Sequence, residues 1–184
     1  MKMHWTTKTI LILLTVGATA CIGVINEGLS KTRAVTNTPI PVKTIEKPYV
    51  LPAIVVADIY AGVNDERAAH GLGALVVSQL LEVSACAKAN DMITKNYWAH
   101  DAPDGTEPWH WFDVAGYGYY NAGENLGYGF RTAQSQVDAW VASPTHEANI
   151  VGSYTEMGVC TLQADHYLVS IDKINLIVNH FATP

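Results

Sequence analysis

The sequence predicts an α+β domain in which the helices come first along the chain and the strands come last. Apolar residues recur at helical spacing from Ile54 to about residue 96, and again in a segment that carries Val137 and Trp140. After residue 156 the pattern changes to short β-prone runs separated by turn residues. Helices and strands segregated in this way are typical of a layered domain with a small antiparallel sheet.

The first two helices are predicted from apolar spacing and from the residues that end them. The first begins near Ile54 and ends at Gly71 and Gly73, because glycine readily leaves the helical conformation. The second ends at Asn96. Its apolar stripe consists of Leu81, Ala85, Ala89 and Met92.

A long loop and a third helix follow. The segment 101–129 is rich in glycine, proline and aromatic residues and is therefore predicted to be irregular. Loops of this length inside a compact domain are usually functional or strongly held in place. Thr132 can cap a helix that carries Trp140, and Ser143 with Pro144 ends that helix.

Three β-prone runs are predicted as strands near the C-terminal end. They cover residues 157–162, 167–171 and 174–181. Polar residues, among them Asp165 and Asp172, separate the runs. Short antiparallel pairing between these runs would form the small sheet.

Residues 1–25 are predicted to be a signal peptide or a membrane anchor. An uncharged run covers residues 9–25, and residues 18–20 form a small-residue cleavage pattern. If helical, the run spans roughly 25 Å, near the short limit for crossing a bilayer. Three outcomes stay open: cleavage after Ala20, lipidation of Cys21, or an uncut anchor. All three predict export, so the protein is expected at the cell surface or outside the cell, with its N-terminal segment meeting the membrane.

Residues 26–52 are predicted to be an extended linker, because prolines keep this segment out of helices, and residues 53–184 form the domain. Residues 1–50 hold six Lys/Arg and two acids, a net charge of +4. Residues 51–184 hold five Lys/Arg and fifteen acids, a net charge of −10. A phosphate-binding surface needs clustered basic residues, so nucleic acid is not expected as a partner.

Four motifs follow one another through the domain. They are Asn64-x-x-Arg67 with Gly71-Leu72 and Leu75; Asn96-Tyr97-Trp98-Ala99-His100 with Pro103-Asp104-Gly105; Gly123-Glu124-Asn125-Leu126; and Trp140 with Ser143-Pro144-Thr145-His146-Glu147-Ala148-Asn149-Ile150 and Tyr154-Thr155-Glu156-Met157-Gly158-Val159. In this order they resemble the superfamily of cysteine-rich secretory, antigen 5 and pathogenesis-related proteins, the CAP or SCP domain, in its bacterial form. The resemblance covers about residues 54–182.

The resemblance implies an α-β-α sandwich with a central cleft. In the family, two His and one or two Glu of this cleft can hold a divalent cation. Carried over, these residues are His100, Glu124 and His146. Animal and plant members place the second Glu where this chain has Ser143, and Glu156 is the nearest acidic candidate, as in bacterial relatives.

The chemistry of this residue set supports two kinds of site. Neutral imidazoles with one or two carboxylates suit Zn²⁺ and tolerate other divalent ions. Without a metal the same groups could act as an acid/base pair, because burial raises a carboxyl pKa toward neutrality. A structural alternative is that Glu124 and the histidines only hold the long loop in place. Glu147, beside His146, stands where relatives commonly carry Arg.

The leading hypothesis is a non-enzymatic extracellular binding module whose cleft takes a divalent cation such as Zn²⁺ and whose partner is a glycan, a peptide or a lipid. The alternative is a metal-dependent or acid/base hydrolase acting on peptide or cell-wall substrates. The His motifs contain no Ser or Cys in a nucleophile pattern. A metal-activated water would need no such nucleophile, so the enzyme hypothesis stays open. A lipid carrier ranks third.

The remaining features have structural interpretations. Asn64 and Arg67 are expected to bond loop backbone, and the aromatic residues of segment 109–130 to give the loop its own core. Rings left exposed near the cleft would favour a glycan or lipid-like ligand. Isolated histidines are expected at the surface or in ordinary hydrogen bonds; these are His4, His70, His166 and His180.

The cysteines leave one question open. Cys86 lies on the second predicted helix, and Cys160 lies on the first predicted strand, which should pack against helices. The two could pair in an oxidising compartment, but the sequence alone does not show that they are adjacent. Both the bonded and the free state therefore remain open.

Overall fold

The computed structural model describes residues 50–170 and 172–184, which belong to a compact unit spanning Lys47–Pro184. The predicted signal peptide or anchor, Cys21 and nearly all of the predicted linker lie outside the described residues. Within the described part of the chain, no helix is both long and apolar enough to cross a membrane.

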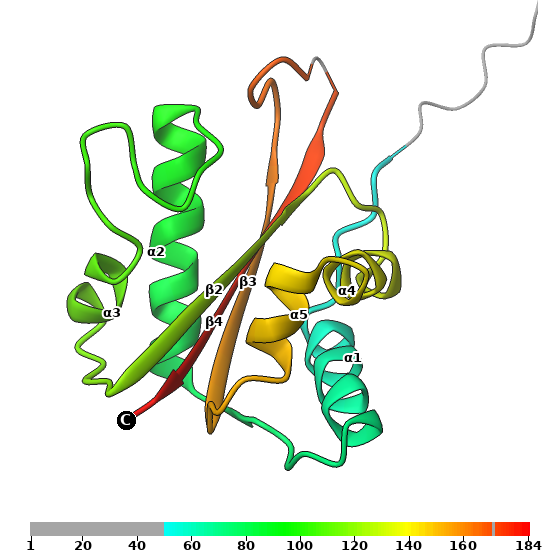
Figure 1. The fold of residues 1–184 in the computed structure, drawn as a ribbon. Helices are drawn as coiled ribbons and strands as arrows, with labels where there is room; N and C mark the ends of the chain where they lie inside the picture. Colours follow the sequence, from blue (N-terminus) through cyan, green and yellow to red (C-terminus); the bar gives the residue numbers. More distant parts are fainter. Residues whose placement is uncertain (1–49, 171) are drawn as a thin grey trace, which may run out of the picture. The chain divides into compact units, whose positions relative to one another are not determined.

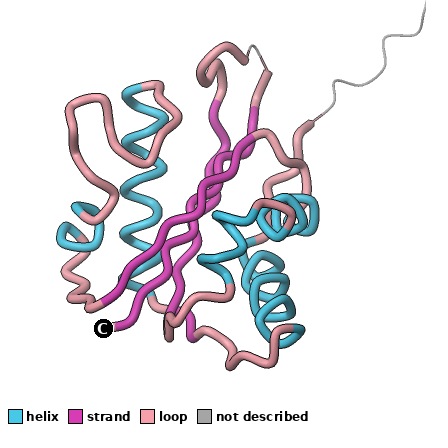
Figure 2. The backbone as a smooth tube through the Cα atoms, viewed as in Figure 1, coloured by secondary structure: helices cyan, strands magenta, loops and turns pink. Residues whose placement is uncertain are grey.

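A four-stranded sheet forms the middle layer (Figures 1 and 2). Its strands are β1 (Val76–Val77), β2 (Asn121–Tyr128), β3 (Glu156–Ala164) and β4 (Ile174–Thr183). They lie in the order β1-β3-β4-β2. The two pairings of β4 are antiparallel, and the short β1 pairs parallel with β3. The predicted antiparallel sheet is thus confirmed, with one short parallel strand added at its edge.

Helices cover both faces of this sheet, as Figure 1 shows. On one face lie α2 (Gln79–Lys95) and α3 (His110–Val114). On the other face lie α1 (Val56–Ala69), α4 (Ala133–Val141) and α5 (Pro144–Ile150). The predicted α+β class and the α-β-α sandwich are confirmed. The predicted order, with all helices before all strands, is wrong, because β1 and β2 lie between helices along the chain.

Each face of the sheet has its own apolar core. The core on the α1 side includes Ile59, Val63, Trp140, Met157 and Phe181. The core on the α2 side includes Ala85, Met92, Leu126, Leu176 and Val178. Full burial of one large apolar side chain contributes about 1.5–3 kcal/mol, so both cores stabilise the sandwich. Strand β4 lies between them, which is why nine of its ten residues are buried.

Several predicted local signals are confirmed. Asn96 ends α2 in the left-handed conformation, with φ 53°. Thr132 caps α4, and its side-chain oxygen accepts a hydrogen bond from Ser135 N at 3.1 Å. Asn64 and Arg67 bond loop backbone as expected, with Leu75 N donating to Asn64 Oδ1 at 2.8 Å and Arg67 Nε donating to Gly73 O at 2.8 Å.

The long predicted loop over residues 101–129 is wrong in part. It contains α3 and the whole of β2, an edge strand paired along its full length with β4. Strand β2 holds glycine and asparagine, which are poor strand formers, so its local pattern is weak. Hydrogen bonds to β4, which is distant in sequence, decide its conformation.

Two further differences concern the C-terminal half. The predicted strand over residues 167–171 is wrong, because residues 167–170 form a turn in which Leu168 has φ 55°. Tyr167 is buried there and donates a hydrogen bond to Tyr97 O, so its β-prone sequence reflects core packing. Pro144 ends the preceding helical run as predicted and also starts a new helix, α5, a position that suits proline.

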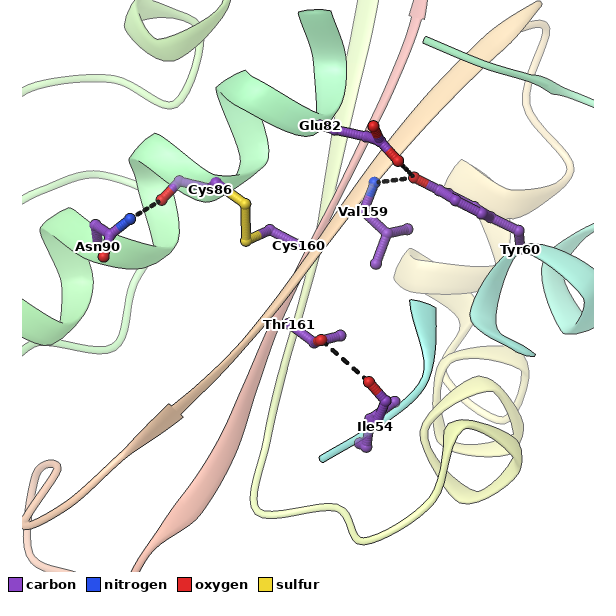
Figure 3. Close-up of a disulfide and its surroundings, with 8 residues drawn as sticks. All are labelled: Ile54, Tyr60, Glu82, Cys86, Asn90, Val159, Cys160 and Thr161. Carbon is purple, nitrogen blue, oxygen red and sulfur yellow. Dashed lines mark hydrogen bonds between the residues drawn. A yellow bond between two sulfur atoms is a disulfide. The ribbon is translucent and has the colours of Figure 1, made fainter. Parts of the chain in front are cut away.

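A disulfide bond joins α2 to β3, which answers the question left open by the sequence (Figure 3). Cys86 on α2 is bonded to Cys160 on β3. Two residues before Cys160, a Cβ on Gly158 would collide with the backbone of Leu81, so glycine is required for this close packing. Figure 3 also shows Tyr60 of α1 donating to Glu82 of α2.

Candidate functional site

Glu124 lies at the centre of the predicted site, on β2, and is only 4% exposed. Its two oxygens accept hydrogen bonds from His100 Nδ1 at 2.7 Å and from His180 Nε2 at 3.0 Å. Burial alone raises the pKa of Glu124, but the hydrogen bonds from the two imidazoles outweigh burial and lower that pKa below its usual value. The carboxylate is therefore ionised and can only accept, so both of these ring nitrogens carry protons.

This hydrogen bond determines which atom His100 presents to a ligand. With Nδ1 protonated, the neutral ring keeps its free lone pair on Nε2, and the side chain is 56% exposed. The hydrogen bond to Glu124 also raises the pKa of His100. A histidine held by a carboxylate at one nitrogen and free at the other can bind a metal ion or accept a proton.

A buried lysine holds the loop that carries His100. Lys88 on α2 is fully buried, and its ammonium donates to Tyr97 Oη at 3.1 Å, to Ala99 O at 3.0 Å and to His100 O. Burial lowers the pKa of Lys88, while the negative charge of Glu124 opposes that shift. Lys88 therefore fixes the backbone at His100 from the interior of the domain.

His146 reaches the site from the opposite layer, on α5. Its Nδ1 lies 2.7 Å from Ser143 Oγ, and its backbone oxygen accepts a hydrogen bond from Asn125 Nδ2 at 3.0 Å. Burial lowers the pKa of His146, and the charge of His100 lowers it further.

Residues 123–126 contact both faces of the sheet, because successive side chains of a strand point to opposite faces. Glu124 and Leu126 point to the α2 face, where Leu126 joins the core. Asn125 points to the other face and accepts a hydrogen bond from Asn149 Nδ2 at 2.8 Å, which holds α5 against the strand. Gly123 leaves room for α5, since a Cβ there would come within 2.9 Å of Asn149 Oδ1. Residues 123–126 thus orient His100 on one face of the sheet. On the other face they hold α5, which carries His146.

A cavity of about 350 Å³ adjoins this arrangement. It is lined by His100, Asp101, Glu107, Pro108, Trp109, Ala122, Gly123, Glu124 and Asn149. His146 is not among the lining residues but lies one turn before Asn149 on α5. Glu156 is not among them either; its carboxylate accepts a hydrogen bond from Tyr117 Oη at 2.9 Å.

A larger cavity, of about 690 Å³, lies away from these residues. It adjoins Val50 and Leu51, where the described chain begins, and Lys173 near β4. Because it contains none of the predicted site residues, we assign the functional site to the smaller cavity.

Three residues of the site were not predicted. His180 and Ser84 are fully buried and extend the hydrogen-bond chain from Glu124, with His180 Nδ1 2.8 Å from Ser84 Oγ. Lys88 is the third. The sequence did contain signals: Lys88 falls on the apolar stripe of α2, and His180 interrupts an apolar strand run. A polar residue in such a position is buried and must be bonded.

Known proteins resemble this chain in sequence and in fold. The family model described as "Cysteine-rich secretory protein family", CAP, matches residues 60–174, which include His100, Glu124 and His146. The chain belongs to the CAP family. The CAP domain is also 35% identical, over 130 residues, to the uncharacterized protein YkwD of Bacillus subtilis (strain 168). That alignment covers 70% of this chain and 47% of YkwD, so the chain spans about half the length of this curated relative.

Solved structures share the fold of this CAP domain. An extracellular protein containing an SCP domain from Bacillus anthracis str. Ames has a TM-score of 0.59 at 22% identity, covering 70% of this chain and 40% of that one. An outer surface protein from Borrelia burgdorferi has a TM-score of 0.60 at 20% identity, covering 70% of this chain and 93% of that one.

Proposed function

We propose that this CAP domain is an extracellular binding module whose cleft holds a divalent cation through His100 and His146. The hydrogen bond from His100 Nδ1 to Glu124 carries the proposal. It places the free lone pair on Nε2 and fixes the ring, and histidines that bind metals commonly donate their other N–H to a carboxylate in this way.

The chemistry of the two histidines suits such an ion. When His146 Nδ1 donates to Ser143 Oγ, His146 Nε2 is also free to bind. Two imidazoles suit Zn²⁺ and leave part of its coordination sphere open for water or for a group of a bound partner. Both Glu124 oxygens already accept hydrogen bonds, which suits a carboxylate that orients His100. A direct ligand role for Glu124 would require one imidazole to leave, and Glu156 would have to release Tyr117.

Two observations support a position outside the cell. The disulfide between Cys86 and Cys160 is typical of an oxidising compartment. Two proteins of the same fold are described as an extracellular protein and an outer surface protein. An export segment over residues 1–25, cleaved or kept as an anchor, would deliver the domain there.

Partly exposed aromatic rings support an organic partner. The rings of Trp98 and Tyr128 pack with centroids 4.7 Å apart and remain partly exposed, and Trp98 lies two residues before His100. Trp109 lines the cavity itself. Aromatic faces bind sugars, apolar peptide side chains and lipid-like groups, so a glycan, a peptide or a lipid is the expected partner.

Calorimetric titration of the full-length chain with Zn²⁺ tests the cation site. We expect His100→Ala and His146→Ala each to weaken binding at this site by at least about 100-fold, because each removes a direct ligand. Glu124→Gln should weaken it by about 10–100-fold. His166→Asn, which changes an exposed histidine elsewhere, is the matched control.

The pH dependence gives a second readout of the same site. Since its pKa is raised, His100 takes up a proton first as the pH falls, and a protonated ring cannot bind the ion. Zn²⁺ binding should therefore be strong at about pH 8 and weak at about pH 6. If the two histidine substitutions remove no Zn²⁺ at either pH, the proposal fails and only a loop-holding role remains.

A second candidate function is acid/base hydrolysis, which the same Glu124–His100 pair favours. A carboxylate that orients an imidazole and leaves Nε2 free is the arrangement of a general base. The test is release of product from peptide and cell-wall substrates by the purified chain. Activity that survives in His100→Ala would exclude His100 as the base, and the absence of product in the wild type would leave the binding module.

A further inference from the structure

A second group of ligand-type side chains lies outside the cleft, between α1 and α5. Glu66 and His70 stand one turn apart, His70 at the C-terminal end of α1, and Glu147 stands in the first turn of α5. One donor atom from each lies within 4.8 Å of the other two. No part of the cleft uses these residues.

The distances in this group match those around a bound ion. His70 Nε2 lies 3.0 Å from Glu66 Oε1 and 3.7 Å from Glu147 Oε1. Two ligand atoms that each lie about 2.0–2.1 Å from a tetrahedral Zn²⁺ are about 3.3 Å apart. The two observed distances fall on either side of this value, and the carboxylate oxygens of Glu66 and Glu147 lie within 4.8 Å of each other. Side-chain rotations can therefore bring all three atoms into coordinating positions.

The backbone beneath the group is held in place. Arg67, between Glu66 and His70, is buried and donates to Ile150 O at 2.7 Å and to Gly152 O at 2.8 Å, at the end of α5. These hydrogen bonds fix α5 against α1. Glu147 is therefore presented to His70 by a preformed support, which lowers the entropy lost when an ion binds.

We propose that Glu66, His70 and Glu147 form a second divalent cation site, suited to Zn²⁺, that joins α1 to α5. One imidazole and two carboxylates are a Zn²⁺ ligand set, and the two negative charges balance the charge of the ion. The nitrogen ligand favours Zn²⁺ over Mg²⁺ and Ca²⁺, which prefer oxygen. The side chains of His70, Glu66 and Glu147 are 43%, 23% and 35% exposed, so an ion can reach them from solvent.

The competing explanation is a protonated His70 paired with two carboxylates, which needs no ion. Titration of the full-length chain carrying His100→Ala and His146→Ala separates the two, because the cleft histidines are then absent. We expect this variant to retain one equivalent of Zn²⁺. Adding His70→Ala or Glu147→Gln should weaken that binding at least about tenfold, whereas adding His166→Asn should leave it unchanged.

A reciprocal design keeps the test decisive if the cleft double variant folds poorly. In the otherwise wild-type chain, His70→Ala with Glu147→Gln should remove one equivalent of bound Zn²⁺ and abolish the rise in melting temperature that this site confers. Mg²⁺ should not compete for the site. Zn²⁺ stoichiometry and melting temperature that do not respond to either substitution would overturn the proposal. Loss of Zn²⁺ only from the variants of His100 and His146 would support the cation site in the cleft and exclude the second site. Failure of one proposal can therefore be told apart from failure of the other.

Discussion

Replacing Glu124 by alanine is expected to lower the free energy of unfolding by about 3–5 kcal/mol, because removing one member of a buried charged network leaves the others uncompensated. His180 is fully buried and would lose its acceptor. Lys88, also fully buried, would lose the negative charge that favours its protonated form. Urea denaturation followed by circular dichroism measures the loss.

Three variants make this prediction specific. Glu124→Gln should lower the free energy of unfolding by less than Glu124→Ala, since the amide oxygen can still accept a hydrogen bond from one imidazole. Glu107→Ala, an exposed carboxylate of the same cavity, should change stability by no more than about 0.5 kcal/mol. In a chain that already carries Lys88→Met, Glu124→Ala should lower the free energy of unfolding by less than it does in the wild type, because no buried cation is left unpaired. A Glu124→Ala loss no larger than that of Glu107→Ala would contradict the network.

The effect of Glu124→Ala should depend on pH in a defined direction. The pKa of Glu124 is lowered in the folded protein. The ionised Glu124 therefore adds to the free energy of unfolding above the usual carboxyl pKa near about 4.3, and this stabilisation is lost as the pH falls below that value. The pKa of His100 is raised, so its contribution is present below about 6.5 and is lost as the pH rises through its folded value. The difference in the free energy of unfolding between the wild type and Glu124→Ala should therefore be largest between about pH 4.5 and about pH 6.5.

Removing the disulfide is expected to have an effect of similar size. The bond between Cys86 and Cys160 closes a loop with a sequence separation of 74 residues. Restricting a loop of this length in the unfolded chain stabilises the folded state by about 4 kcal/mol in the chain-entropy description. We therefore expect Cys86→Ser with Cys160→Ser to lower the melting temperature markedly, as measured by calorimetry.

Reductant supplies the control for this second prediction. Wild-type protein should melt at a lower temperature with reductant than without it, and the double serine variant should not respond. Thiol titration of the unfolded Cys21→Ser chain without reductant should find no free thiol. Two free thiols under those conditions would show that Cys86 and Cys160 are not bonded.

Much of the fold was predictable from the sequence because the signals involved are local. The stripe of Leu81, Ala85, Ala89 and Met92 predicted α2, and Thr132 and Asn96 predicted helix ends that the structure confirms. An apolar stripe must be buried, the Thr132 side chain bonds within its own turn, and asparagine tolerates the left-handed backbone that ends α2. None of these three signals depends on distant residues. The motifs around His100, Glu124 and His146 likewise indicated the family.

The sequence by itself determined helices α1, α2 and α4, strands β3 and β4, and the motifs of the family, because periodicity and capping act over a few residues. Only the tertiary structure decided that residues 121–128 form a strand, that His180 and Lys88 support Glu124, and that Cys86 meets Cys160. It also brought Glu147 to His70. Each of these depends on contacts between residues far apart in the chain, whose free energy appears only when two separate elements pack together.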